Sequence, residues 1–503
     1  MTEFNNMILL QSVFLPIILA PIVYLLGKKI GKNVGWITFL ILLYSTILML
    51  YASSLSDVYL ELYDWHPIGN FGLQGDGLSL PFALMIAILS VCLSVYSISY
   101  MNHRIRETTS DTNIINKKFG LYFSLYLIYF SGMLGTVLAT NLIQFYIFFE
   151  LMLIPSYFLI AEFGYGDKAR ISLMYFIWTH IGALILLSGI LAIGMLGGSF
   201  DISSINELNI AFNIRIWLAA AIIIGLFVKL AAFGVHIWLP HAHAEAPTPI
   251  SALLSPVMIG IGGYAILRII LFILPSVYLS TTLFVSIWGL ITMVYGGLMA
   301  LSQDDIKRLL AYSSISQMGY IIFGIGSAYY LGITGSVFQY VSHGTAKGIL
   351  FMVAGTIIMK SGGVRSIRQM GGLSKKLPIT TIAALIGFMT LFGVPPLNGF
   401  QSEWILFYGA FVGSISLNSD ARLILTGVAL LSSTLTAGYA LLTMKRVFFG
   451  KLPDRLSNIK ENDLCLLVPI IFLVILTIFL GIYPNIILDR LIPTISEIFS
   501  IGV

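Results

Sequence analysis

Four ionisable residues interrupt stretches of sequence that are otherwise long and apolar: Glu150, Lys229, Lys347 and Glu403. A charged side chain deep in a membrane costs roughly 2.5 to 3.5 kcal/mol on insertion scales, so such residues usually face a protein interior or water and pair with one another. Any one of them could be a structural ion pair between helices. Two acids and two lysines together favour a path along which protons or ions move.

Glu150 and Lys229 are expected to influence one another as a pair. Burial disfavours the charged form of each residue, and an opposite charge nearby favours it. Pro155 follows Glu150 in the same apolar stretch and loosens the helix, because it lacks a backbone donor. A change in the distance between the two side chains would therefore change how readily Lys229 releases a proton.

His343 and Lys347 are spaced i to i+4, which places both on one face of a helix. Histidine titrates near neutral pH, so the two residues could form a two-station proton relay. Alternatively, the histidine bonds to a backbone carbonyl and the lysine extends along apolar surface to the membrane interface.

Three further histidines are candidates for the same path. His180 lies in an apolar stretch and either lines the path or is a satisfied interior residue. His241 and His243 follow the Trp-Leu-Pro sequence that comes after Lys229. Their spacing is not a recognised zinc pattern, so we expect proton uptake from the cytoplasm there and no metal site.

The elements that carry Lys229 and Glu403 are expected to be interrupted helices. After Lys229 the apolar pattern gives way to histidine, proline and small residues up to residue 250. Before Glu403 the sequence LFGVPPLNGF contains Pro395 and Pro396, and proline breaks a helix. Non-helical backbone at membrane depth is tolerated only where it is buried in protein or lines a wet cavity. Each break therefore predicts an ion site or a gate.

The composition is that of a polytopic membrane protein. Of 503 residues, 58% are hydrophobic and 10% are charged, whereas about 25% charge is normal for a soluble protein. With about 20 apolar residues per crossing, the chain is predicted to be an all-α membrane protein of about fourteen spans. Residues 1–503 would form a single membrane domain, because no connection is long enough to bury a soluble core.

Other classes of site have little support in the sequence. Cys92 and Cys465 are too few for a zinc site or an iron–sulfur cluster, and no disulfide between them is expected. The net charge of +5 is better explained by membrane orientation than by binding to nucleic acid. No nucleotide-binding loop is apparent, so no redox step is expected on this chain itself.

The spans fall into two groups of similar design. The seventh predicted span (214–236) and the twelfth (378–410) each combine an apolar helix, a weak point and an ionisable residue. Residues 117–271 and 281–447 are therefore expected to form two five-helix repeats of opposite topology, an arrangement typical of secondary transporters.

Basic residues predict the orientation. Most of the 27 lysine and arginine residues lie in alternate loops, and loops rich in these residues are cytoplasmic. Both termini are therefore predicted on the opposite, non-cytoplasmic side. The connection 55–77 fits that side, because it contains acidic residues and no lysine or arginine. The tail after Pro484 is short, and no long lateral helix is expected.

The same residues carry a family resemblance. The stretches FFELMLIPSYFLIAEFG, VKLAAFGVHIWLPHAHAEAPTPISALL, DDIKRLLAYSSISQMGYIIFG, HGTAKGILF and PPLNGFQSEW follow one another in this order. With them the chain resembles the antiporter-like membrane subunits of respiratory complex I, especially the chain M (chain 4) type. The resemblance implies fourteen spans, inverted five-helix repeats, and broken seventh and twelfth helices.

The resemblance also implies a function and an environment. Protons would be translocated along buried charges in an energy-transducing membrane, such as a prokaryotic plasma membrane, driven by redox chemistry in other membrane and peripheral subunits. Quinone, flavin and iron–sulfur clusters would belong to those partners, with no cofactor on this chain. By position, Glu150 and Lys229 resemble the glutamate–lysine pair of the family. Glu403 resembles its terminal acid, and Lys347 the lysine of an H-x-x-x-K motif.

Two positions depart from the family pattern. Gly260 stands where the eighth span usually has a lysine, and Ala231 stands where a proline usually follows the seventh-span lysine. The missing lysine opens a gap between Lys229 and Lys347, which water, a histidine, or serine and tyrosine hydroxyls would have to bridge. Glycine would leave room for water. Alternatively, the chain couples motion without pumping efficiently.

The leading hypothesis is a proton-translocating subunit of a complex I-like oxidoreductase that passes electrons from NADH or another donor to a quinone. Protons from the cytoplasmic half would pass Lys347 and His343 to Glu403 and leave on the far side. One alternative is a subunit of a multi-chain Na+/H+ antiporter or of a membrane-bound hydrogenase. Another is a structural subunit that conducts nothing.

Overall fold

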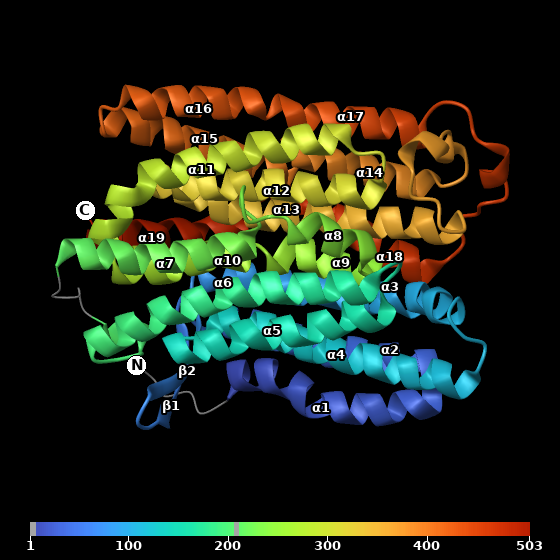
Figure 1. Cartoon of the computed structure of the whole chain (residues 1–503), viewed down its shortest axis with the longest axis horizontal. Helices are drawn as coiled ribbons and strands as arrows, with labels where there is room; N and C mark the ends of the chain where they lie inside the picture. The colour runs from blue at the N-terminus through green and yellow to red at the C-terminus, as the bar shows by residue number, and fades with distance from the viewer. Residues whose placement is uncertain (1–6, 206–210, 503) are drawn as a thin grey trace.

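Long helices packed side by side make up most of the computed structural model (Figure 1). The structure describes residues 7–205 and 211–502. Within these ranges, 11 helical segments are long and apolar enough to cross a membrane. The chain is therefore a multi-pass membrane protein, as its composition predicts. Residues 1–6 and 503, whose side of the membrane the sequence also predicts, lie outside the described residues.

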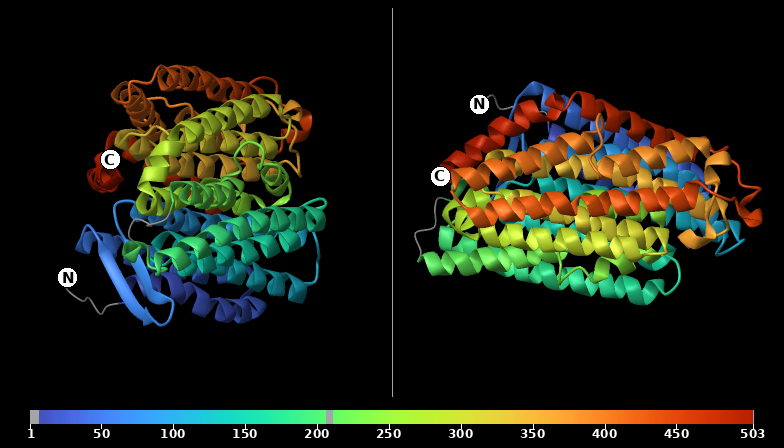
Figure 2. Two further views of the ribbon diagram at one scale, coloured as in Figure 1. Left: turned by 60° about the vertical axis from the view of Figure 1, so that its left-hand side comes forward. Right: turned by 90° about the horizontal axis from the view of Figure 1, so that it is seen from above.

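Residues 8–197 lie mainly along one side of the molecule and residues 275–448 along the other, with residues 212–271 between them (Figures 1 and 2). The last two helices, over residues 464–502, also lie in the middle (Figure 1), where the first of them packs against the helix of residues 79–106. The N-terminal elements are α1 (Ile8–Ile30), α2 (Val34–Leu55), β1 (Tyr59–Trp65), β2 (Gly69–Gly75), α3 (Ser79–Arg106), α4 (Thr112–Leu138), α5 (Leu142–Phe163) and α6 (Lys168–Gly197). The middle elements are α7 (Phe212–Leu230), α8 (Trp238–Glu245), α9 (Thr248–Leu253), η3 (Leu254–Met258), α10 (Ile261–Ala265) and η4 (Ile266–Leu271). The C-terminal elements are α11 (Pro275–Ser302), α12 (Ile306–Ile325), α13 (Tyr330–Lys360), α14 (Pro378–Leu391), α15 (Asn398–Ser416), α16 (Asp420–Ser432), α17 (Thr434–Phe448), α18 (Leu464–Ile482) and α19 (Asn485–Gly502).

Polar side chains fix where several helices begin. The side chains of Asp111, Asn141, Asp305 and Asp463 each accept a hydrogen bond from a backbone N–H in the first turn of the helix that follows. These N–H groups have no partner within the helix, so a side-chain oxygen at this position stabilises the start of the helix.

Both predicted helix breaks are present. The helix that carries Lys229 ends at Leu230 and resumes as α8, and the helix before Glu403 ends at Leu391 and resumes as α15. The sequence Phe-Gly-Val occurs in each break, at 233–235 and 392–394, and its glycine has a positive φ in both, 91° and 65°. Ala231 also has a positive φ of 51°, which a proline could not adopt.

The apolar span over Thr248–Leu271 is irregular. Two π-helical segments, η3 and η4, lie on either side of the short helix α10. Its apolar window is entirely buried inside the protein. Such π segments arise when a helix accommodates an extra residue in one turn, and they occur frequently at functional sites.

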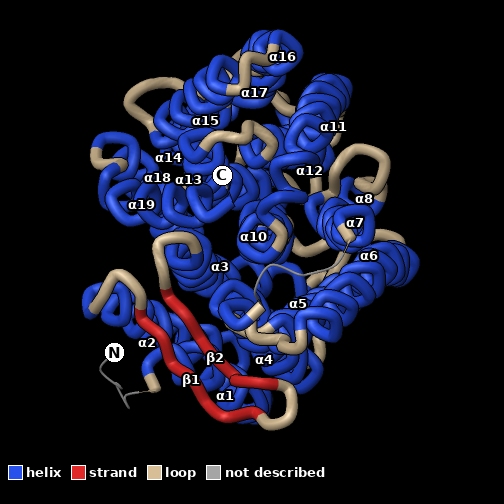
Figure 3. The backbone as a smooth tube through the Cα atoms, turned by 90° about the vertical axis from the view of Figure 1, so that its left-hand side faces the viewer, coloured by secondary structure: helices blue, strands red, loops and turns tan. Residues whose placement is uncertain are grey.

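Three further features go beyond the sequence prediction. The connection 55–77, expected as a loop, contains the antiparallel hairpin β1–β2, which lies across one end of the bundle (Figure 3). The carboxylate of Glu61 in this hairpin accepts the N–H groups of Leu9 and Leu10 at the start of α1, which holds the hairpin to the bundle. The tail after Pro484 forms α19, which packs against α13. The apolar span over Asp420–Phe448 is divided at Ser433 into α16 and α17.

Candidate functional site

Glu150 pairs with His180, a partner that the sequence did not predict. Glu150 lies on α5 and His180 on the neighbouring helix α6, with Nδ1 of the histidine 3.0 Å from Oε2 of the glutamate. His180 is therefore the direct polar partner of Glu150, and their contact joins α6 to α5. The other carboxylate oxygen of Glu150 is buried and has no hydrogen-bond partner in the described part of the chain.

Lys229 interacts with Glu150 without touching it. The lysine lies in the last turn of α7, is 2% exposed and has its ammonium 4.7 Å from the ring centre of Phe149. Glu150 acts on it electrostatically, but no described acidic group forms an ion pair with it within 4.0 Å. The expected pair therefore acts over a longer distance, with His180 as the direct partner of the acid.

Lys347 is held inside the protein by α12. It is fully buried, and its ammonium donates to the carbonyl oxygen of Leu310 at 2.9 Å and to the hydroxyl of Ser313. This position rules out a lysine that extends to the membrane interface. His343 is also fully buried, and neither of its ring nitrogens has a hydrogen-bond partner among residues 7–205 and 211–502. The backbone of Pro256 in η3 interacts with its ring, which agrees with the alternative of a histidine beside a backbone carbonyl.

A chain of neutral polar side chains leads from the middle of α12 towards Glu403. The hydroxyl of Ser402 donates to Oε1 of Gln339 at 2.5 Å, and Nε2 of Gln339 donates to Oε1 of Gln317 at 2.5 Å. All three side chains are buried. Sequence reasoning based on charge missed them, although two glutamines within apolar spans were the available signal.

Glu403 lies against the break between α14 and α15. It is 9% exposed, and a Cβ atom placed on Gly393 would be only 2.7 Å from its Oε2. Both this approach and the positive φ of Gly393 require a residue without a side chain. The other oxygen, Oε1, is buried without a partner among the described residues. An ionisable group, Glu403, therefore lies directly beside this helix break.

Gly260 does not leave room for water, contrary to the expectation from sequence. A Cβ atom at this position would be 2.3 Å from the ring of Tyr340 on α13. The tyrosine ring also packs on Phe82, with ring centres 4.2 Å apart. The space beside the glycine is filled by an aromatic side chain, so a lysine at this position could not be accommodated in the observed packing.

The two histidines of α8 lie in different environments. His241 is exposed, whereas His243 is fully buried beside the ring of Phe351. Residues two apart on a helix point in different directions, so these two do not form one cluster. Lys347 and Lys307 both act electrostatically on His243. His243 is therefore the residue of this pair that lies near the internal lysine.

Lys307 is a buried lysine that the sequence placed in a loop. It is 1% exposed, and its ammonium donates to the carbonyl oxygens of Ala244, at 3.4 Å, and Ala246. These carbonyls are at the C-terminal end of α8, where a cation is favourable. Because Lys307 lies among the basic residues that predict a cytoplasmic loop, its burial was not expected from the sequence.

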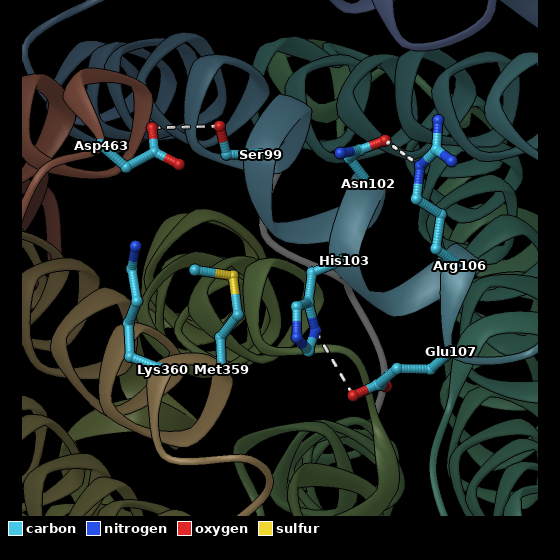
Figure 4. Close-up of a pocket in the computed structure, with 8 residues that line it drawn as sticks. All are labelled: Ser99, Asn102, His103, Arg106, Glu107, Met359, Lys360 and Asp463. Carbon is cyan, nitrogen blue, oxygen red and sulfur yellow. Dashed lines mark hydrogen bonds and ion pairs between the residues drawn. The ribbon is translucent and has the colours of Figure 1, made fainter. Parts of the chain in front are cut away.

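One cleft is lined by none of the four charged residues predicted from the sequence. Its volume is about 500 Å³, and it is formed at the ends of α3, α13 and α18 by groups that include His103, Arg106 and Lys360 (Figure 4). Several of these groups already have partners, such as Glu107 for His103 at 3.4 Å. No set of three or more described His, Cys, Asp or Glu side chains is arranged to hold a metal ion. The candidate site is therefore the internal line of polar groups.

The chain matches the family model described as NADH:quinone oxidoreductase/Mrp antiporter, TM, over residues 139–445. This region contains both helix breaks and all four buried charges predicted from the sequence. The chain belongs to this family. The first part of the chain, residues 65–108, matches a second model, NADH-Ubiquinone oxidoreductase (complex I), chain 5 N-terminus.

Individual members of the NADH:quinone oxidoreductase/Mrp antiporter family are similar over nearly the whole chain. F(420)H(2) dehydrogenase subunit M of Methanosarcina mazei is 32% identical, with 97% of each chain covered. NADH-quinone oxidoreductase subunit M of Rickettsia prowazekii is 29% identical, with 95% of this chain and 96% of the other covered. The resemblance stated from the motifs is thus confirmed.

Two solved structures share the fold of this family member. The first is respiratory complex I from Thermus thermophilus with bound NADH, with a TM-score of 0.85, 23% identity, and 99% of this chain and 100% of the other covered. The second is the Mrp complex from Dietzia sp. DQ12-45-1b, with a TM-score of 0.85, 21% identity, and 99% and 98% covered. Both are multi-subunit assemblies by description.

Proposed function

We propose that this chain is a proton-translocating membrane subunit of a complex I-like oxidoreductase that transfers electrons from NADH or another donor to a quinone. The observation that carries the proposal is the set of polar groups within the bundle on α5, α6, α7, α12, α13 and α15. It consists of the partly exposed pair Glu150 and His180, the buried Lys229 and Lys347, the chain of Gln317, Gln339 and Ser402, and Glu403. Ionisable groups at this depth are costly unless they serve transfer or pairing.

The redox chemistry belongs to partner subunits in this proposal. Relatives named as subunits of a F(420)H(2) dehydrogenase and of NADH-quinone oxidoreductases differ in the donor that their names give, so the donor is not a property of this chain. Flavin, iron–sulfur clusters and quinone would be held by the other membrane and peripheral subunits. This chain would contribute the path for protons.

The architecture we propose has fourteen spans and two inverted repeats, residues 117–271 and 281–447. The Phe-Gly-Val sequence in both breaks, each with a positive-φ glycine, supports it. The separation in sequence between His180 and His343 is also the separation between Glu150 and Ser313. Ser313 is the residue that contacts Lys347, so a hydroxyl in the second repeat would occupy the place of the acid in the first.

We propose that protons from the cytoplasmic side reach Lys347 by way of His243 and continue towards Glu403. The support is that His243 is fully buried and that Lys307 and Lys347 both interact with it electrostatically. The chain of Gln317, Gln339 and Ser402 would then connect α12 to the helix of Glu403. The membrane would be an energy-transducing one, with both chain ends on the non-cytoplasmic side.

A second candidate is a subunit of a multi-chain Na+/H+ antiporter. The description of the matching family model, which names the Mrp antiporter beside the oxidoreductase, supports this candidate. The two functions differ in their partners, because the antiporter would need no redox subunits. Purification of the native assembly distinguishes them: flavin and iron–sulfur subunits in the same complex support the oxidoreductase.

Replacement of Lys229 by alanine tests the proposed function. The variant removes the buried cation on which Glu150 acts, so we expect a sharp loss of proton translocation per electron transferred while the complex still assembles. The measurement is the ratio of protons to electrons in membrane vesicles, together with a native gel for assembly.

A matched control is Lys29→Ala, because Lys29 is exposed at the end of α1. It should leave the proton-to-electron ratio unchanged. A normal ratio in the Lys229→Ala complex would contradict the proposed function. A change in assembly alone would favour the structural subunit.

A further inference from the structure

Three donors converge on one carbonyl oxygen beside Lys347. The oxygen of Leu310 lies 2.9 Å from the ammonium of Lys347, 2.9 Å from the hydroxyl of Ser313 and 2.8 Å from the hydroxyl of Ser314. All of these side chains are buried. A carbonyl oxygen offers two lone pairs, so the three donors compete, and at least one hydroxyl must direct its proton elsewhere.

Ser314 has an alternative partner on another helix. Its hydroxyl oxygen lies 2.5 Å from that of Ser255, and either oxygen can be the donor. Ser255 is fully buried in the π-helical segment η3. In the described chain, the span 248–271 to which η3 belongs has a single charged residue, Arg268 near its end. The hydroxyl pair is therefore a direct polar contact between this span and the surroundings of Lys347.

The two directions of this hydrogen bond have opposite effects on Lys347. When Ser314 donates to Ser255, the oxygen of Leu310 is available to the ammonium. When Ser255 donates to Ser314, the Ser314 hydroxyl turns to Leu310 and competes with the ammonium for the same oxygen. Hydrogen bonds to a charged group are stronger than neutral ones, so a protonated lysine favours the first arrangement and a neutral lysine the second.

We propose that Ser255 and Ser314 are positioning residues that link the π-helical segment η3 to the proton affinity of Lys347. The proposal rests on the proposed function, because it concerns the use of Lys347 as a proton station. No covalent bond is exchanged between the serines; each keeps one hydroxyl proton and only its direction changes. Rotation of two hydroxyl groups would thereby couple the first half of the molecule to the second.

Other titratable groups also lie near Lys347. His343 on its own helix and His243 on α8 interact with it electrostatically. Lys307 on α12 and Glu403 on α15 lie on elements packed against α13. Lys307 donates to carbonyl oxygens at the end of α8, and Glu403 lies against Gly393. No described acidic side chain forms an ion pair with Lys347. The hydroxyl of Ser313 contacts the ammonium directly, and Tyr439 on α17 acts on Ser313. The serine pair is the part of these surroundings that reaches η3.

The test uses Ser255→Ala and Ser314→Ala in the whole complex. Removal of Ser255 leaves Leu310 as the acceptor for Ser314, which should lower the proton affinity of Lys347. Removal of Ser314 frees that oxygen and should raise it. We expect the midpoint of the pH profile of proton translocation to shift in opposite directions, each by about one pH unit, or tenfold in proton affinity.

The double variant and two further substitutions complete the test. Without Ser314 the other serine cannot act, so Ser255→Ala should have no added effect in the Ser314→Ala background. Ser314→Thr keeps a hydroxyl and should retain the wild-type midpoint. Ser316→Ala is the matched control, because its buried hydroxyl on the same helix donates to Met293 on α11 at 2.9 Å.

The outcomes separate this inference from the proposed function. Shifts in the same direction, additive shifts or unchanged midpoints in both single variants would overturn the role of the serines. If Lys229→Ala still abolishes translocation in that case, the proposed function stands without them. If Lys229→Ala has no effect, the proposed function fails, whatever the serine variants show.

Discussion

At the residue scale, the close contact between Gly260 and Tyr340 gives a direct prediction. Gly260→Ala would place a methyl group 2.3 Å from the tyrosine ring, and overpacking of this kind costs about 1 to 3 kcal/mol. We expect a lower thermal unfolding temperature for the purified complex and weaker assembly.

The matched substitution is Gly427→Ala on α16. A Cβ atom there has no neighbour within 4 Å, and alanine is favoured over glycine inside a helix by about 1 kcal/mol. This control should leave the unfolding temperature unchanged or raise it. Equal unfolding temperatures for the Gly260 variant and the unmodified complex would show that the tyrosine ring moves away without cost.

Charge within apolar sequence was enough to find the principal residues of the candidate site. Glu150, Lys229, Lys347 and Glu403 lie in buried or largely buried positions, as their sequence context predicts. Their partners were not predictable, because the His180 contact depends on how α5 and α6 pack. Lys307 was misplaced for a related reason: its environment is created by the end of α8, which is distant in sequence.

At the scale of elements, the two helix breaks followed from proline and glycine in the sequence, since these residues impose backbone geometry locally. The π-helical segments η3 and η4 did not follow, because nothing local distinguishes an apolar helix that accommodates an extra residue. The hairpin β1–β2 did not follow either, because Asp57, Glu61 and Asp64 are residue types that strands disfavour.

The connection between α13 and α14 is anchored by Asp304, which gives a pH-dependent prediction. Burial alone would raise the pKa of Asp304, but the hydroxyl of Ser366, the N–H of Arg368 and the charge of Arg368 hold it below the ordinary 3.8. Because folding lowers this pKa, the stabilisation is complete above the ordinary value and is lost as the pH falls through the lower one.

Hydrogen exchange at the Arg368 N–H, corrected for the intrinsic rate, measures this anchor. Protection should be constant near neutral pH and decrease only below about pH 4. Asp304→Asn should weaken protection at neutral pH and remove the acid-dependent loss. Identical protection in the two proteins would show that the backbone contacts, such as Ile367 N–H to the Asp304 carbonyl at 2.6 Å, suffice alone.

At the scale of the whole molecule, the distribution of basic residues predicts sidedness. In a background without Cys92 and Cys465, a cysteine at the exposed position Lys375 should react with an impermeant reagent only from the cytoplasmic side. A cysteine at the exposed position Asp64 in β1 should react only from the opposite side. Labelling of intact cells and inverted vesicles measures both, and reaction of the two positions from the same side would contradict the predicted topology.

Contacts between distant parts of the chain could not be predicted from the sequence. Arg268, near the end of the irregular span, forms a buried ion pair with Asp76 before α3, with both carboxylate oxygens 2.7 Å from the guanidinium. The sequence assigned Asp76 only to an acidic connection. Such a pair depends on the arrangement of the entire bundle, which local sequence patterns do not contain.

The position of each buried charge relative to its helix break has an electrostatic consequence. Lys229 lies in the last turn of α7, whereas Glu403 lies near the start of α15 with its carboxylate against the break. The C-terminal end of a helix carries roughly half a negative charge and the N-terminal end roughly half a positive one. Lys229 therefore faces a helix pole of opposite sign, whereas the carboxylate of Glu403 lies beside Gly393, two residues after the C-terminal end of α14. Both breaks thus set their ionisable group beside the C-terminal pole of a helix. Exchange of the two charges would leave the net charge of the chain unchanged but remove the one favourable contact with a pole, that of Lys229.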